Sequence, residues 1–267
     1  MDAAKLAKLR KKYADEKMFG TFNHYHKISP AALCRIADIG DVPVQHRYNL
    51  DEGLGDIEKY FHKVMDAGIK PLTAGGDHSI TYPILKAVGR DAPVGLVHVD
   101  AHCDTDGWMG NSKFYHGAPF RNAVLDGVLD PERTIQIGIR GPAEPVWQFS
   151  YESGMTVIHI EDFVEMGLKK VIRKAREVVG DLPTYISFDV DGLDPSFAPG
   201  TGTPEVGGLT TRESLALIRG LHGLNLVGGD VVEVAPQYDP TTNTARAGAQ
   251  MMFEILCLLA EATAKRR

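Results

Sequence analysis

The sequence lacks a basic excess, a clustered cysteine motif and any signal for export. Its formal net charge is -6 and its pI about 5.9, so no surplus of Lys and Arg is present to replace the counterions of a nucleic acid. The three cysteines show no metal-like or disulfide-like spacing, which is typical of a reducing compartment. No run of about 18 apolar residues and no short apolar block at the N-terminus is present. We therefore expect a cytoplasmic protein without nucleic-acid or membrane partners.

The apolar pattern predicts one α/β domain. The 267 residues, 43% of them hydrophobic, are enough for a full core, and we expect a single domain over 1–267 with an atypical N-terminal segment, 1–36. From residue 54 onward, apolar runs of strand length alternate with segments of helical period, which is typical of a mostly parallel sheet in a three-layer α-β-α fold. The expected strands are 69–74, 94–99, 134–139, 156–160, 184–188 and 225–234. The expected helices are 54–66, 79–89, 117–126, 143–152, 161–178, 210–222 and 245–264, and residues 2–17 form a further basic, weakly amphipathic stretch.

Two connections are too long and too rich in Gly and Pro to be simple turns. They cover residues 101–116 and 191–208, and each follows the carboxyl end of an expected strand. Long structured loops in compact domains are usually functional. Because open α/β sheets bind their ligands at the carboxyl edge, we expect the functional site to lie there.

The strand expected at 94–99 runs directly into a row of polar side chains. Asp100, His102 and Asp104 stand at alternate positions, so in extended backbone all three point to the same side. This spacing lets one short segment present two carboxylates and an imidazole to a single point. The pattern is typical of a segment that binds a metal ion.

Two further segments contribute candidate ligands to the same edge of the sheet. Asp189 and Asp191 follow the strand expected at 184–188 in the same alternate spacing, and His78 follows two glycines that let the chain turn sharply. Each signal alone has a structural alternative, since the two acids could cap a loop and a single histidine is often an ordinary packed residue. However, four acids gathered at strand ends would repel one another and lose hydration unless cations lay between them.

The full set predicts a site for two divalent cations. It consists of four carboxylates and two imidazoles, namely His78, Asp100, His102, Asp104, Asp189 and Asp191. Four negative charges match two such ions, and a shell of oxygen with some imidazole suits Mn²⁺ best, with Ni²⁺, Co²⁺ or Zn²⁺ as alternatives. Paired metals lower the pKa of a shared water toward neutrality, which predicts a hydrolase that attacks carbon or phosphorus.

Two other residues indicate the kind of substrate. Glu233 lies near the end of the strand expected at 225–234, where a buried carboxylate favours a cationic partner such as a guanidinium group, and an ion pair with Arg246 is the structural alternative. His116 ends the first long loop, where it can deliver a proton to a leaving amine or, alternatively, cap the next helix. Both residues therefore join the candidate site.

Five motifs, taken in order, resemble the ureohydrolase (arginase and agmatinase) family. They are GGDHS at 75–79, VDAHCD at 99–104, SFDVDGLDP at 187–195, GTGTPEVGGLTTRE at 200–213 and VEVAPQYDPTTNTA at 232–245. The last two motifs are most similar to the agmatinase, guanidinobutyrase and guanidinopropionase branch. The resemblance implies an arginase-like fold, homo-oligomers such as trimers or hexamers, and hydrolysis of a small linear guanidino compound to urea and an amine.

The resemblance also implies a role for each site residue. One Mn²⁺ would be held by His78, Asp100, Asp104 and Asp189. The other would be held by Asp100, His102, Asp189 and Asp191, so that Asp100 and Asp189 bridge the two ions. Asp104 would also act in catalysis, while Glu233 would orient the guanidinium group and His116 would shuttle a proton.

The resemblance also bears on the substrate tail and on the N-terminus. Residues 115–141 are similar to the guanidino-acid hydrolases, which favours a carboxylate tail, as in guanidinobutyrate or guanidinopropionate, over the amine tail of agmatine. Asn111, Arg121 and Arg140 are candidates to bind that tail, although each could equally be ordinary surface. Members of the family usually begin with a further strand and a Gly-Pro loop, and residues 1–36 contain neither, so we expect the sheet to lack that strand.

Two other interpretations remain open. A chain without the first strand could be a non-catalytic subunit of a ureohydrolase assembly, although such a subunit has no need to keep four carboxylates together. Deacetylases have a related fold but use a single zinc, and they would not require the second pair of ligands. The metal content distinguishes these interpretations, because only the hydrolase predicts two ions per chain.

Overall fold

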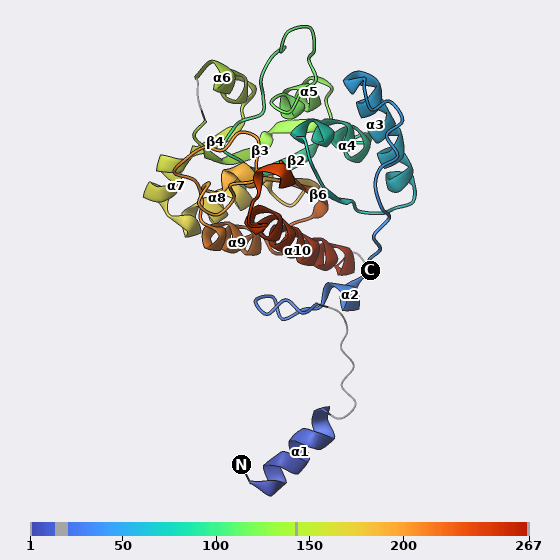
Figure 1. Ribbon diagram of the computed structural model, residues 1–267, viewed down its shortest axis with the longest axis vertical. Coiled ribbons are helices and arrows are strands. Elements are labelled where there is room, and N and C mark those ends of the chain that lie inside the picture. Colours follow the sequence, from blue (N-terminus) through green and yellow to red (C-terminus); the bar gives the residue numbers. More distant parts are fainter. Residues whose placement is uncertain (1, 14–20, 142–143, 266–267) are drawn as a thin grey trace.

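The computed structural model describes residues 2–13, 21–141 and 144–265 of the chain, and its centre is a parallel sheet of six strands (Figure 1). The strands are β1 (Leu72–Ala74), β2 (Val94–Val99), β3 (Leu129–Ile139), β4 (Thr156–His159), β5 (Thr184–Asp189) and β6 (Leu226–Val232). Their order across the sheet is β1-β6-β5-β2-β3-β4, and every neighbouring pair is parallel. All six carboxyl ends therefore meet at one edge of the sheet.

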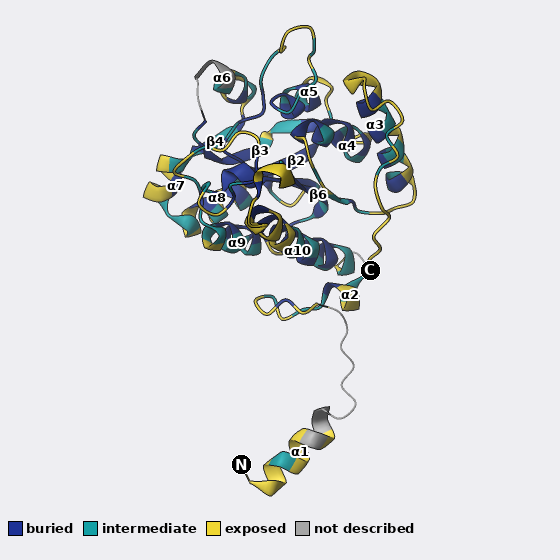
Figure 2. Cartoon of the chain, in the orientation of Figure 1, coloured by how far each residue is buried: buried dark blue, intermediate teal, exposed yellow. Residues whose placement is uncertain are grey.

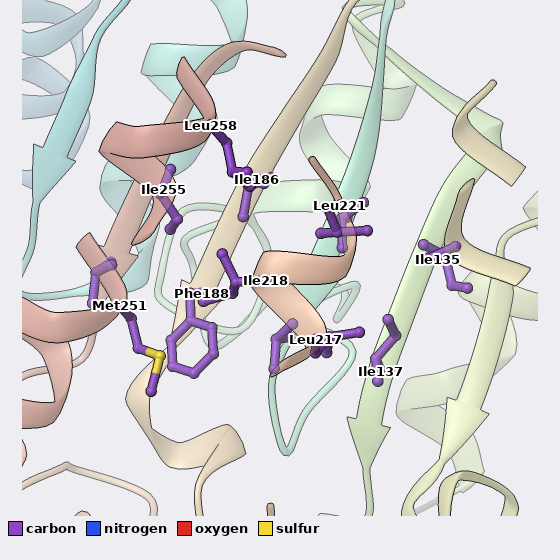
Figure 3. Close-up of a cluster of buried hydrophobic side chains, with 14 of the residues drawn as sticks. Ile135, Ile137, Ile186, Phe188, Leu217, Ile218, Leu221, Met251, Ile255 and Leu258 are labelled. Atoms are coloured by element: carbon purple, nitrogen blue, oxygen red, sulfur yellow. The ribbon is translucent and has the colours of Figure 1, made fainter. Parts of the chain in front are cut away.

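One face of the sheet is covered by the later helices. These are α7 (Ile160–Met166), α8 (Leu168–Val179), α9 (Thr211–Gly220) and α10 (Asn243–Ala264). Their buried side chains pack with those of the central strands in one large apolar cluster, in which Phe188 lies close to Met251 and Ile218 (Figure 3). Strands β2 and β5 are buried along their whole length, as expected for central strands of a parallel sheet that is covered on both faces.

The opposite face is covered by the earlier helices. These are α3 (Leu50–Asp66), α4 (Thr81–Val88) and α5 (Pro119–Leu125), while α6 (Glu144–Ser153) packs beside β4. A second apolar cluster joins this layer to the sheet, and Leu96, Tyr185 and Phe120 are fully buried in it. Figure 2 shows the buried strands between the two helical layers. The predicted three-layer α-β-α fold with a parallel sheet is thus confirmed.

Two helices differ from the sequence-based prediction for local reasons. The helix expected over 161–178 is divided into α7 and α8, because Gly167 between them adopts a left-handed φ of 75° that ends the first helix. Helix α3 begins at Leu50 rather than at residue 54, since the side chain of Asn49 accepts a hydrogen bond from the Glu52 N–H and caps the helix earlier.

The described N-terminal residues, 2–13 and 21–49, contain two helices and no named strand. Helix α1 (Ala3–Tyr13) falls within the amphipathic stretch 2–17, whose last four residues lie outside the described part, and it stands apart from the α/β body (Figure 1). Helix α2 (Pro30–Leu33) packs on α10. Among the described residues no strand precedes Leu72.

Helix α10 is long and apolar enough to resemble a membrane-spanning helix, which the sequence analysis did not predict. By length and composition it is, among the described residues, the one helix that could cross a bilayer. However, 56% of its apolar window is buried inside the protein, and the helix packs against β6 and α9. Its apolar composition is therefore explained by its place in the core.

Candidate metal centre

Four neighbouring strands bring the candidate residues to one place. In the order of the sheet, β1 leads to His78, β6 to Glu233, β5 to Asp189 and Asp191, and β2 to the segment 100–104. His78 opens a short 3₁₀ helix, η1 (His78–Ile80), and Asp191 lies in a second one, η2 (Val190–Gly192). These short helices turn the chain across the edge of the sheet immediately after its strands, so that the side chains converge.

His78 faces three carboxylates. Its Nδ1 lies 2.8 Å from Asp104 Oδ2, 3.3 Å from Asp189 Oδ2 and 3.5 Å from Asp100 Oδ2. The ring is completely buried, and Nδ1 makes no hydrogen bond of acceptable geometry within the described part of the chain. A buried nitrogen that points between three acids without bonding to one of them is the arrangement expected of a metal ligand.

His102 is the centre of a second, adjoining set. Its Nδ1 lies 3.1 Å from Asp191 Oδ2 and 3.4 Å from Asp100 Oδ1. Asp100 therefore presents one oxygen to each histidine, as a bridging ligand would. The donor atoms of Asp100, His102 and Asp191 all lie within 4.8 Å of one another.

The spacing of the donor atoms fits divalent cations. Nitrogen and oxygen ligands lie about 2.1 Å from ions such as Zn²⁺, so ligands that share one ion are about 3.0–3.4 Å apart, depending on the geometry. The distances from His78 Nδ1 and His102 Nδ1 to their neighbouring carboxylates span 2.8–3.5 Å. The six predicted ligands therefore form a set that could hold ions of this size.

The electrostatics of the cluster favour cations as well. Burial and the neighbouring acids Asp191 and Asp100 raise the pKa of Asp189 well above its ordinary value. Burial, together with Asp100, raises the pKa of Asp191 to about 6. Burial opposes a charge on His78, but the nearby acids, Asp104 foremost, more than offset it, so that the pKa of His78 is raised well above 6.5. Binding of cations would replace these protons, because ligating groups must be deprotonated.

A chain of hydrogen bonds fixes the other side of the His78 ring. Its Nε2 lies 2.9 Å from Ser187 Oγ, which in turn donates to Asp230 Oδ1 at 2.6 Å. Asp230 also accepts hydrogen bonds from the hydroxyls of Thr81 and Tyr185. Because Ser187 donates to the acid, it accepts the Nε2 proton, and Nδ1 keeps its lone pair for the cluster. Sequence reasoning missed this chain, although the alternate spacing of Ser187 and Asp189 on β5 indicates that they share a face.

Two residues of the site have a left-handed backbone. The φ angles are 52° at Asp104 and 59° at Glu233, a region that residues with side chains rarely occupy. Such conformations cost free energy, on the order of 1–3 kcal/mol each, and they cluster at functional sites. Both carboxylates are thus held in place by a backbone conformation that local sequence preferences oppose.

Glu233 keeps one oxygen available. Its Oε1 accepts the backbone N–H of His78 at 2.7 Å, while no hydrogen bond to Oε2 is found among the described residues. Burial raises the pKa of Glu233, because the charged carboxylate loses hydration and, among the described residues, has no cation beside it in compensation. Within the described part of the chain Glu233 forms no ion pair, and Arg246 is exposed, so the structural alternative for Glu233 is wrong.

His116 lies near Glu233 on the first long loop. Burial raises the pKa of Glu233, the hydrogen bond and charge of His78 lower it, and the charge of His116 adds a smaller effect in the same direction as His78. The helix that follows begins at Pro119 with Ala118 as its N-terminal cap, so His116 is not the capping residue. The side chain of Asn122 donates to Lys113 O and Ala118 O at 2.9 and 3.0 Å, and so holds together the two ends of the turn that carries His116.

The three candidates for binding a substrate tail differ in their surroundings. Asn111 is exposed at the tip of the long loop, and no hydrogen bond joins it to the acids in the described residues. Arg140 donates to six backbone carbonyls, those of Gly138, Asp191, Gly192, Leu193, Glu205 and Val206, so its guanidinium group is already occupied. Arg121 lies over the ring of Phe149 and borders a cavity of about 140 Å³ with Asp106 and Trp108.

The fold and the cluster define a class of protein in which a parallel α/β sheet gathers acids and imidazoles at its carboxyl edge. The model of the Arginase family matches residues 7–258. The guanidinopropionase of Pseudomonas aeruginosa is 52% identical over 91% of this chain and 77% of its own length, and the mitochondrial agmatinase of Gallus gallus is 48% identical over 92% and 73%. The solved structure of proclavaminate amidino hydrolase from Streptomyces clavuligerus aligns with a TM-score of 0.83 and 36% identity, over 87% of this chain and 78% of that one.

The chain belongs to the arginase family, which confirms the resemblance seen in its motifs. Members of this family depend on two bound metal ions, and the clusters of His and Asp described above could hold such ions. The relationship also argues against a deacetylase with a single zinc.

Proposed function

We propose that this chain hydrolyses the guanidino group of a small linear guanidino compound and releases urea and an amine. The observation that carries the proposal is the buried Nδ1 of His78, which faces three carboxylates without a hydrogen bond, while the carboxylate of Glu233 accepts the backbone N–H of the same residue. Such a site binds cations for catalysis and, beside them, offers a carboxylate for a guanidinium group. The relatives named guanidinopropionase and agmatinase support the same type of reaction.

Each site residue has a proposed role in this reaction. The metal ligands are His78, Asp100, His102, Asp104, Asp189 and Asp191, and Mn²⁺ is the proposed metal. Two such ions supply a nucleophilic water near neutral pH. Glu233 binds and orients the guanidinium group through Oε2, and Asp104 takes up the proton that the attacking water releases. His116 donates a proton to the leaving nitrogen, so that the C–N bond breaks to give an amine and urea.

We propose a substrate with a carboxylate tail, such as 3-guanidinopropionate or 4-guanidinobutyrate, and agmatine is the alternative. The relative named guanidinopropionase is somewhat more similar to this chain than the one named agmatinase, which supports that choice. Of the two arginine candidates we propose Arg121 for such a tail, because the guanidinium group of Arg140 is bonded to backbone carbonyls while Arg121 borders a cavity. A role for Asn111 in substrate binding stays a prediction, as do a single catalytic domain, a trimeric or hexameric assembly and a cytoplasmic location.

A urea-release screen tests the proposed function. Purified protein freed of metal with EDTA and reloaded with Mn²⁺, Ni²⁺, Co²⁺ or Zn²⁺ would be given 3-guanidinopropionate, 4-guanidinobutyrate, agmatine or arginine. Urea would be measured by colorimetry and the amine by mass spectrometry. We expect kcat/KM for a guanidino acid to exceed that for agmatine by about tenfold or more, since one charge-paired tail contributes on the order of 1–3 kcal/mol. Two bound ions without urea from any substrate would instead indicate a non-catalytic subunit.

The contact made by Asn122 gives a second prediction. Replacing Asn122 by Ala removes the two hydrogen bonds that join Lys113 O and Ala118 O, and so releases the turn that carries His116. We expect kcat to fall by about 10- to 100-fold, because a shift of roughly 1 Å in a catalytic group has an effect of this size. The content of bound metal should stay at two ions, since no ligand is changed.

A matched control lies on the same helix. Leu125 is 65% exposed, and its replacement by Ala should leave kcat unchanged. Steady-state kinetics and metal analysis of both variants test whether Asn122 holds the turn that carries His116. Equal kcat values for the Asn122→Ala variant and the native chain would show that the turn holds His116 without this side chain.

A further inference from the structure

His98 is a buried, polar residue with no role in the reaction as described so far. It lies on β2, two positions before Asp100 and on the same side of the strand, and its ring is completely shielded from solvent. The ring centroid lies 4.4 Å from that of Phe120 and 5.5 Å from that of His78. A buried imidazole between an apolar ring and a cluster of acids calls for a specific set of partners.

Two hydrogen bonds define which nitrogen of His98 carries the proton. The Nε2 of Gln136 donates to Cys103 O at 2.5 Å and lies 3.1 Å from His98 Nδ1. The Cys103 carbonyl fixes the orientation of this amide, because the opposite orientation would set two oxygens against each other. His98 Nδ1 therefore accepts a hydrogen bond from Gln136. The proton of the neutral ring is on Nε2, which lies 2.7 Å from Asp100 Oδ2 and donates to it.

These bonds decide between two roles for His98. Its nearest donor atom lies within 4.8 Å of those of His78 and Asp100, so the three could be taken as the ligands of one ion. However, Gln136 occupies the lone pair of Nδ1, and the proton on Nε2 points at Asp100. Neither nitrogen is then free to bind a metal ion.

The bonds to Asp100 also determine what this carboxylate can do. Its Oδ1 accepts the backbone N–H of His102 at 2.6 Å, and its Oδ2 accepts the His98 proton. A carboxylate oxygen has two lone-pair sites, so each oxygen keeps one of them. Oδ1 faces His102 and Oδ2 faces His78, and the carboxylate can thus offer one lone pair to each half of the cluster.

We propose that His98 is a positioning residue, which holds Asp100 by a hydrogen bond so that its carboxylate bridges the two halves of the metal centre. Gln136 supports this role, because its hydrogen bond to Nδ1 selects the tautomer of His98 whose Nε2 proton is donated to Asp100. The proposal rests on the metal centre described under the proposed function. It assigns a role to two residues of β2 and β3 that lie outside the ligand set.

Metal titration of variants tests the proposal without any substrate. His98→Phe and His98→Met both remove the donor, whereas His98→Gln keeps an N–H group. Binding of Mn²⁺ to metal-free protein would be measured by calorimetry, and the ion content at saturation by mass spectrometry. We expect two ions per chain in all three variants, with a Kd raised by about 10- to 100-fold in the two variants that lack the donor and by much less in His98→Gln. Gln136→Met should also weaken binding, because the tautomer is no longer selected.

Two outcomes would overturn the proposal. Loss of one of the two ions at saturation in His98→Phe and His98→Met would show that His98 is itself a ligand. An unchanged Kd in these variants would show that Asp100 is held without His98. Two variants without the donor are used, so that a folding defect in one of them, seen by circular dichroism, does not decide the result. A native chain that binds two ions but releases no urea would remove the proposed activity and leave this test intact.

Discussion

Replacement of Asp189 by Ala is expected to abolish urea release, with kcat reduced by about a thousandfold or more. When the bound ions are lost, the pKa of the attacking water returns toward its bulk value of roughly 15.7. Asp189 Oδ2 lies 3.3 Å from His78 Nδ1, and its Oδ1 accepts the N–H of Asp191. One side chain therefore connects the first ligand set to the turn that carries the second. Its loss should reduce the content of bound Mn²⁺ below two ions per chain.

Asp181 supplies the matched control for this prediction. It precedes the same strand, β5, but it is exposed and lies at the opposite end of the strand from the cluster. Asp181→Ala should keep both full activity and two ions. Urea release and metal content would be measured for both variants. Loss of both in Asp189→Ala alone would show that Asp189 is a metal ligand rather than one of many acids that contribute negative charge. Retention of two tightly bound ions in Asp189→Ala would contradict the proposed ligand set.

Replacement of Glu233 by Gln is expected to lower kcat/KM by about 10²- to 10³-fold, because loss of one partner from a buried charge pair costs about 2–5 kcal/mol. The amide keeps the size of the side chain and can still accept the His78 N–H through its oxygen. It removes only the negative charge that would meet a guanidinium group. The metal content should stay at two ions, which distinguishes this variant from the one at Asp189.

Arg246 provides the control for Glu233. It is exposed, and no ion pair with Glu233 occurs in the described residues. Arg246→Ala should therefore change neither kcat nor KM. A large effect of Arg246→Ala on activity, together with a small effect of Glu233→Gln, would reverse the roles assigned to these two side chains. Steady-state kinetics with the preferred guanidino substrate measures both.

The parts of this molecule that depend on short-range pattern could be predicted from the sequence. The expectation of strand β2 at 94–99 is confirmed, because a mainly apolar run of strand length followed by alternating polar residues has few other interpretations. The alternate spacing of Asp100, His102 and Asp104 placed these side chains on one face, and the structure brings them together with His78 and Asp189. The remaining ligand, Asp191, follows the same rule.

The parts that depend on distant contacts could not be predicted in the same way. The bonds of Arg140 to carbonyls near the two ends of the long connection 191–208 are invisible in the sequence, where the residue looks like a candidate for substrate binding. The role of Gln136 likewise depends on β3 lying beside β2. His98, in contrast, continues the alternate spacing of Asp100 by one step toward the N-terminus, and this signal was present but was not used.

The arrangement of the sheet links metal binding to folding and to the lifetime of the folded protein. Strands β2 and β5 lie side by side, with Val97 opposite Ile186, although a long stretch of chain separates them. The metal centre is therefore assembled only when this long-range pairing has formed, and an unfolded chain offers no comparable set of ligands. By mass action, a free metal ion at a hundred times its Kd would favour the folded chain by about 2.7 kcal/mol for each site. The supply of the bound metal would thus influence the lifetime of this protein against proteolysis, and starvation for that ion would reduce the amount of the protein as well as its activity.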